Sequence, residues 1–151
     1  KYVTAFPVGT YHGTNFINIR SDTWKKLSQK EKKALTENLA HAVREMAEVY
    51  EEDDENIKKE AMAKGVQWVP VGPDFEPAVA KFRSNDIARV IELGKSRGVK
   101  DPAALIDIFV ENVDKWTKIV GEIGSGSWES EQWDKYEAAL KREIFDQVKY
   151  P

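Results

Sequence analysis

One stretch without proline or glycine, residues 29–64, constrains the fold of this chain more than any other feature. Ser28 followed three residues later by Glu31 is a capping-box pattern, in which the two side chains satisfy free amide groups at a helix start. Gly65 can adopt the left-handed conformation that ends a helix. Apolar side chains recur at spacings of three and four, at Leu35, Leu39, Ala42, Val43, Met46, Tyr50, Ile57 and Ala61. The stretch predicts one spine helix, about 29–64, roughly 54 Å long.

A helix of this length needs support along its course, so we expect either a coiled-coil arm or a spine running between two lobes. Its middle carries five consecutive acids, Glu51-Glu52-Asp53-Asp54-Glu55. This run is read either as a solvated face or as a cation site. Calcium is excluded because its loops need alternating ligands and a glycine at the sharp turn.

Composition narrows the classes of function. The chain has 151 residues, of which 41% are hydrophobic, enough for one domain with a sizeable core. Its net charge is −3 with both signs interspersed, so we do not expect nucleic acid as a partner. Cysteine is absent and there are two histidines, which excludes disulfides, thiolate catalysis, cysteine-based zinc sites and triple-histidine metal sites. We expect no metal and no cofactor.

The first residues already resemble the inside of a strand. Neither an apolar run of about 20 residues nor a basic-then-apolar signal segment is present. Because the chain opens at Lys1 without a methionine and enters this strand without a polar lead-in, we expect a processed product or the later part of a longer chain.

The remaining sequence predicts short strands and long helices. We expect a strand-loop-strand region over 1–20 with strands at 1–6 and 15–20, a helical turn capped by Ser21 or Asp22, a strand at 66–71 and a helical region over 74–148. Within that region Asp74 and Asp101 each cap a helix, residues 121–127 form a flexible connector, and a last helix starts near Glu129. The expected apolar stripes are Val79, Phe82, Val90, Ile91 and Gly94, then Leu105, Ile108, Phe109, Val113, Trp116, Ile119 and Val120, then Trp133, Tyr136, Leu140, Ile144 and Phe145. The fold class is α/β, dominated by helices, with strands too few to make an independent sheet.

The loop from Tyr11 to Asn15 is the candidate binding site. Gly13 lets a backbone approach a ligand, His12 and Asn15 offer hydrogen bonds, and Tyr11 adds a ring with a hydroxyl. The alternative is that His12 bonds a neighbouring carbonyl and Asn15 caps a turn. No second group completes a catalytic set, so we expect no catalytic residue.

Outside this loop, a histidine and the tryptophans are the other side chains that could contact a ligand. His41 lies one position from the apolar stripe of the spine and is expected to be a packing residue. The five tryptophans are spaced as core and core-edge residues, and Trp128, beside the glycine-serine connector, is the one candidate for a sugar-stacking platform.

The order of elements resembles a known family. The segments that carry this resemblance are PVGTYHGTNFINIRSDTWKKLSQKEKKAL, the long helix to AMAKGV, FRSNDIARVIELGKSRGVKDPAALIDIFVENVDKW and the terminal KREIFDQV. Together they resemble the C-terminal half of DctP-type solute-binding proteins of tripartite ATP-independent periplasmic (TRAP) transporters.

The resemblance implies the helix-rich part of a two-lobed periplasmic-binding-protein-like fold, with a spine helix spanning both lobes. It implies a periplasmic receptor that captures a small organic acid and delivers it to DctQ- and DctM-like membrane permease subunits, without turnover. The family's carboxylate-binding arginine would lie in a missing N-terminal half. The region that lines the ligand cleft in the family matches Tyr11, His12, Gly13 and Asn15.

Two other functions are open from the residues alone. A helical protein-interaction module would use the spine and its acid run to recruit a partner, and it would present an exposed apolar stripe and self-associate. A small hydrolase or lyase would use His12 as a base.

Overall fold

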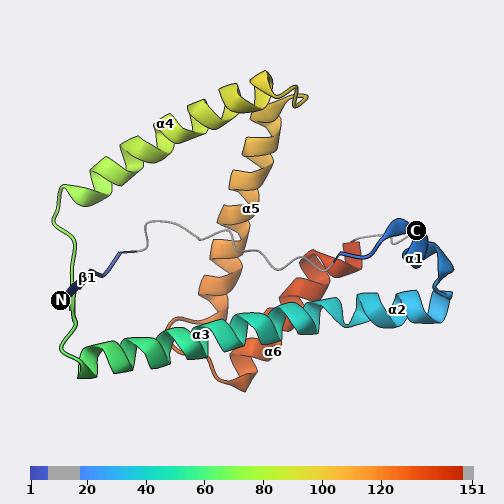
Figure 1. The fold of residues 1–151 in the computed structure, drawn as a ribbon, viewed down its shortest axis with the longest axis horizontal. Helices are drawn as coiled ribbons and strands as arrows, with labels where there is room; N and C mark the ends of the chain where they lie inside the picture. The colour runs from blue at the N-terminus through green and yellow to red at the C-terminus, as the bar shows by residue number, and fades with distance from the viewer. Residues whose placement is uncertain (7–17, 148–151) are drawn as a thin grey trace. The chain divides into compact units, whose positions relative to one another are not determined.

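The computed structural model describes residues 1–6 and 18–147, which are mostly helical (Figure 1). In chain order the elements are β1 (Tyr2–Thr4), α1 (Ser21–Lys26), α2 (Gln29–Glu37), α3 (Leu39–Ala63), β2 (Gln67–Val69), α4 (Phe75–Ser96), α5 (Pro102–Ile123), α6 (Ser130–Glu143) and the short 3₁₀ helix η1 (Phe145–Gln147). The chain divides into two compact units, Lys1–Tyr11 with Ala61–Lys118 and His12–Glu60 with Ile119–Pro151. The divisions fall inside α3 and inside α5. The expectation of a helix-rich chain with few strands is confirmed.

The predicted single spine is two consecutive helices, α2 and α3, which run one after the other in Figure 1. The break is at Asn38, whose side-chain amide donates to the Ala34 carbonyl oxygen at 2.7 Å. Its backbone N–H bonds the carbonyl of Leu35, three residues back, instead of the usual position four residues back. Because asparagine competes with the backbone for helical carbonyls in this way, it can interrupt a helix that contains neither proline nor glycine.

Both predicted ends of the spine are confirmed. Ser28 Oγ accepts the Glu31 amide at 3.3 Å, and the Glu31 carboxylate accepts the Ser28 amide at 2.7 Å. Gly65 has φ +81°, and its N–H bonds the Met62 carbonyl while that of Val66 bonds the Ala61 carbonyl. These two bonds make a Schellman ending, which satisfies carbonyls that the helix leaves free.

The first unit holds the parallel pairing of β1 with β2, in which Tyr2, Val3 and Thr4 lie opposite Gln67, Trp68 and Val69. Phe6 packs edge-on against Phe75 at the start of α4, with the ring centroids 4.9 Å apart. Helices α4 and α5 approach closely at Gly94, where an added Cβ would lie 2.7 Å from Cβ of Pro102. The two expected strands at 1–6 and 66–71 are therefore present in shorter form.

The apolar stripe predicted for α5 is largely exposed, whereas that of α4 is partly buried except at Phe82. Exposure reaches 67% at Phe82 and 61% at Phe109. The stripe members Leu105, Ile108, Val113 and Val120 are exposed as well. The periodicity correctly indicated helices, but it did not indicate that the α5 stripe would be exposed.

The second strand predicted at 15–20 is wrong where it can be checked. Residues 18–20 form no strand, and residues 15–17 lie outside the described residues. Arg20 instead stands at the N-cap of α1 and forms a two-point contact with Asp22, both distances being 3.1 Å. The expected cap at Ser21 or Asp22 is therefore also wrong, because both residues already lie in the helix.

The predicted helix caps Asp74 and Asp101 differ in whether the side chain accepts a backbone hydrogen bond. Asp74 stands at the N-cap of α4, but its side chain accepts no capping hydrogen bond. Asp101 Oδ1 accepts the Ala104 amide at 3.2 Å, as its cap role requires. The connector predicted at 121–127 is shorter than expected because α5 continues to Ile123, and Gly124, with φ +143°, then leaves the helix.

The core of the second unit forms where α6 packs on α3. The buried apolar side chains among residues 18–60 and 119–147 are Ala40, Trp133, Ala139 and Leu140. Of the spine stripe, Leu35 and Tyr50 are 44% and 56% exposed, so the face of the helix that meets α6 is centred on Ala40. None of the described helices is long and apolar enough to cross a membrane.

Candidate functional site

The predicted binding loop lies outside the described residues. Tyr11, His12, Gly13 and Asn15 all fall within residues 7–17, so their geometry is not described. Their role stays a prediction from the sequence.

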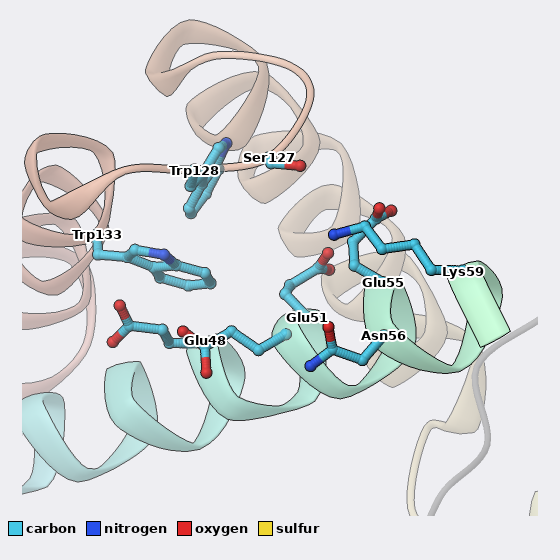
Figure 2. Close-up of a pocket in the computed structure, with 9 residues that line it drawn as sticks. Glu48, Glu51, Glu55, Asn56, Lys59, Ser127, Trp128 and Trp133 are labelled. Carbon is cyan, nitrogen blue, oxygen red and sulfur yellow. The ribbon is translucent and has the colours of Figure 1, made fainter.

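A cavity of about 360 Å³ lies in the second unit, between α3 and the segment that leads into α6 (Figure 2). Its lining residues are Glu48, Glu51, Glu52, Glu55, Asn56, Lys59, Ser127, Trp128 and Trp133. Its volume is within the range of small-molecule sites, about 300–1,000 Å³. A second cavity, of about 490 Å³, lies between α2 and the end of α6 and has lysines as well as acids in its lining.

One wall of the cavity in Figure 2 is acidic because of the helical repeat of α3. Glu48, Glu52 and Glu55 recur at spacings of four and three, which places them along one side of the helix together with Glu51. Arg44 Nη1 lies 2.9 Å from Glu48 Oε2, and Lys58 Nζ lies 3.6 Å from Glu55 Oε1. Within the described chain no ion pair is formed by Glu51 or Glu52. Two carboxylates of the wall thus lie beyond ion-pair distance of any described cation.

The other wall is aromatic. The rings of Trp128 and Trp133 meet edge to face, with centroids 4.8 Å apart and planes at 68°. Tyr136 packs against both, at 5.8 Å from Trp128 and 6.1 Å from Trp133. Trp133 is 5% exposed, and burial raises the pKa of the Tyr136 phenol. This packing fixes the orientation of the rings before any ligand arrives.

Trp128 is held where α5 ends. Its indole Nε1 donates to the Gly124 carbonyl oxygen at 3.1 Å, and this bond closes the turn between α5 and α6. Its side chain is only partly buried. Trp128 thus lies at the edge of the core, lining the cavity while packing against a second tryptophan, and its role in sugar stacking stays a prediction.

A group of charged side chains joins α3 to α6. His41 Nδ1 lies 2.9 Å from Glu137 Oε2, and His41 Nε2 lies 3.3 Å from Glu45 Oε1. The hydrogen bond with Glu137 raises the pKa of His41, and Glu45 adds to this. Lys141 and then His41 lower the pKa of Glu137. His41 is therefore a half-exposed ion-pair residue, which corrects its interpretation as a packing residue.

The sequence did not predict the contact that Glu137 makes, nor that the glutamates of α3 lie across a cavity from Trp128 and Trp133. A lysine four residues after Glu137 was a signal for a helical ion pair, but nothing local points to His41, 96 positions away. The acid run and Trp128 were each noticed, but their proximity depends on how α6 packs on α3. Among the described residues there is no group of three or more carboxylate or histidine side chains that could hold a metal ion.

No protein-family model matches the sequence, and neither a curated protein nor a solved structure matches it at a significant level.

Proposed function

We propose that this chain is the ligand-binding part of a TRAP-type periplasmic receptor, which captures a small organic acid for delivery to a membrane permease without chemical turnover. The first support is the sequence itself, in which the order of elements across the chain resembles the C-terminal half of DctP-type receptors. The residues proposed to contact the acid are Tyr11, His12, Gly13 and Asn15.

The observation that carries most of the proposal is the parallel pairing of β1 with β2. Parallel strands need a long crossover connection and occur almost only in α/β proteins whose sheets are covered by helices. Each of these strands has three residues, and a two-stranded sheet of that size is not stable alone. In an α/β lobe with further strands, this pair would be the edge of a larger sheet.

The exposed faces of α4 and α5 support a further body of protein as partner. Soluble proteins rarely leave large side chains such as Phe82, Ile108 and Phe109 uncovered along one helix after another. In the proposed receptor these faces would be covered by the upstream half, which would also supply the arginine that binds the ligand carboxylate.

The acidic cavity of Figure 2 is a poor site for an organic acid, because its carboxylates repel a negative ligand. The proposal therefore assigns the acid to the loop that contains His12 and Asn15, where neutral donors and a titratable imidazole are available.

Isothermal titration calorimetry with lactate, succinate and gluconate tests the proposal. We expect weak but saturable binding of at least one of these acids, because the Tyr11–Asn15 loop would supply its own contacts while the arginine of the upstream half is absent. Asn15→Ala should weaken that binding by at least about tenfold, as for a lost hydrogen bond to a charged group. Asn85→Ala, an exposed site on α4, is the matched control and should leave binding unchanged. No binding of any acid, or equal effects of the two variants, would contradict the proposal.

A helical protein-interaction module is the second candidate, because α5 presents Leu105, Ile108, Phe109 and Val113 in an exposed stripe. Such a stripe would drive self-association. Sedimentation equilibrium separates the two functions. A dimer that Phe109→Ser converts to a monomer, with no acid bound by either form, favours the interaction module over the receptor.

A further inference from the structure

We infer that the cavity between α3 and the Ser127–Trp133 segment is a binding site for a small organic cation of the alkylammonium class. This site shares no residue with the proposed organic-acid site, and the inference does not depend on the receptor function. It combines a concave space of about 360 Å³, an acidic wall and an aromatic wall within one unit of the chain (Figure 2).

The charge of the lining selects a cation. Four of the nine lining residues are glutamates, and Lys59 is the one basic residue among them. Arg44 partly neutralises Glu48, but Glu51 and Glu52 form no ion pair within the described chain. Because glutamates four residues apart on a helix repel one another, a bound cation would relieve this repulsion in the Glu48/Glu52 and Glu51/Glu55 pairs.

The aromatic wall selects an organic cation over a metal ion. Tryptophan is the best of the aromatic side chains for attracting an ammonium group over its ring face, and it also buries the alkyl groups that such a cation carries. Indole rings offer nothing to a hydrated Mg²⁺ or Ca²⁺, which needs several oxygens in its coordination shell. No set of side chains suitable for a metal ion occurs in the described residues.

The rings are held in place before binding. Trp128 is anchored by its hydrogen bond to Gly124 and by edge-to-face packing on Trp133, and Trp133 belongs to the core of the unit. A ligand therefore does not have to order this wall, which lowers the entropic cost of binding. The arrangement resembles the general chemistry of ammonium recognition, in which rings surround the alkyl groups and carboxylates neutralise the charge.

Titration of tetramethylammonium and of 1,4-diaminobutane into the whole chain, followed by tryptophan fluorescence at constant ionic strength, tests this inference. At least one of the two cations should give a saturable change that sodium chloride does not reproduce. Glu51→Gln should weaken binding by about fivefold, and Trp128→Ala by about tenfold. Asp53→Asn removes the same charge from the same run without lining the cavity, and it should change affinity less than about twofold.

Three results would overturn the inference. One is the absence of a saturable change with both cations, and another is an equal effect of Glu51→Gln and Asp53→Asn, which would mean general charge screening. The third is binding of lysine-rich peptides without binding of either small cation, which would mean a macromolecular partner. Should Trp128→Ala fail to fold, the Glu51→Gln and Asp53→Asn pair still decides, because both side chains are exposed.

Discussion

The imidazole Nδ1 of His41 lies 2.9 Å from Oε2 of Glu137, and this contact ties α3 to α6 across 96 positions of sequence. It stands beside the buried cluster of Ala40, Trp133 and Leu140, so the polar and apolar contacts between these helices reinforce one another. The His41–Glu137 contact also holds α6 against α3, the helix that carries the acidic wall of the cavity.

The contribution of the His41–Glu137 contact to the stability of the fold should depend on pH. The pKa of His41 is raised from 6.5, chiefly by Glu137, so its contribution to stability is complete below pH 6.5 and is lost as the pH rises through the raised value. The pKa of Glu137 is lowered from 4.5, chiefly by Lys141, so its contribution is complete above pH 4.5 and is lost as the pH falls. The His41–Glu137 contact therefore stabilises the fold most between pH 4.5 and pH 6.5.

Urea unfolding of the chain and of His41→Gln, compared at pH 5.5 and 8.5, checks this dependence. The original chain should lose more stability than the variant between the two pH values. Identical losses would mean that the ion pair does not form. Glu45→Gln should have a smaller effect than His41→Gln, because Glu45 contributes less to the raised pKa.

Replacing either of two helical glycines with alanine should have opposite effects on stability, because only Gly94 lies where α4 and α5 approach closely. Gly94→Ala should destabilise the chain by about 1–3 kcal/mol, because its Cβ would lie 2.7 Å from Pro102 and force the helices apart. Gly121→Ala meets nothing within 4 Å and should stabilise α5 by up to about 1 kcal/mol through helix propensity. Urea unfolding followed by circular dichroism measures both. Stabilisation by Gly94→Ala would show that the helices do not meet there.

The starts of α2 and α4 should respond differently when the side chains of their N-cap residues, Ser28 and Asp74, are removed. Ser28→Ala removes an acceptor for the Glu31 amide and should cost about 1 kcal/mol of unfolding free energy. Asp74→Ala should cost less, because the Asp74 side chain accepts no capping bond. Chemical denaturation of the two variants gives the comparison, and an equal loss would contradict the distinction.

The location of the core can be tested with two leucines. Leu140 is 4% exposed, and Leu140→Ala should cost about 2–5 kcal/mol. Leu105 is 54% exposed, and Leu105→Ala should change stability by no more than about 0.5 kcal/mol. Thermal unfolding by calorimetry distinguishes them. A large loss from Leu105→Ala would mean that the stripe on α5 is covered, for example by a second copy of the chain.

Local patterns predicted the ends of the helices well. Ser28, Glu31 and Gly65 act within a few residues, so the sequence contains the whole interaction. The stripe containing Trp133 and Leu140 was likewise recognisable because helical periodicity is local. The break at Asn38 was missed because proline and glycine are the strong helix breakers, whereas asparagine interrupts only when its side chain takes a backbone carbonyl.

Long-range pairing could not be predicted in the same way. Helical periodicity shows which face of a helix is apolar, but it does not show whether another segment covers that face, as the exposed Phe82 and Phe109 demonstrate. The contact of His41 with Glu137 and the meeting of Glu51 with Trp128 across one cavity depend on tertiary packing. For the predicted loop at His12 and Asn15, the sequence remains the basis of the proposal.

Native mass spectrometry of the chain with an equimolar mixture of lactate, succinate and gluconate tests the receptor proposal most directly. We predict a species with the mass of the chain plus one acid molecule, and loss of that species in Asn15→Ala. Detection of the bare chain alone at every acid concentration would contradict the assignment of this chain to an organic-acid receptor.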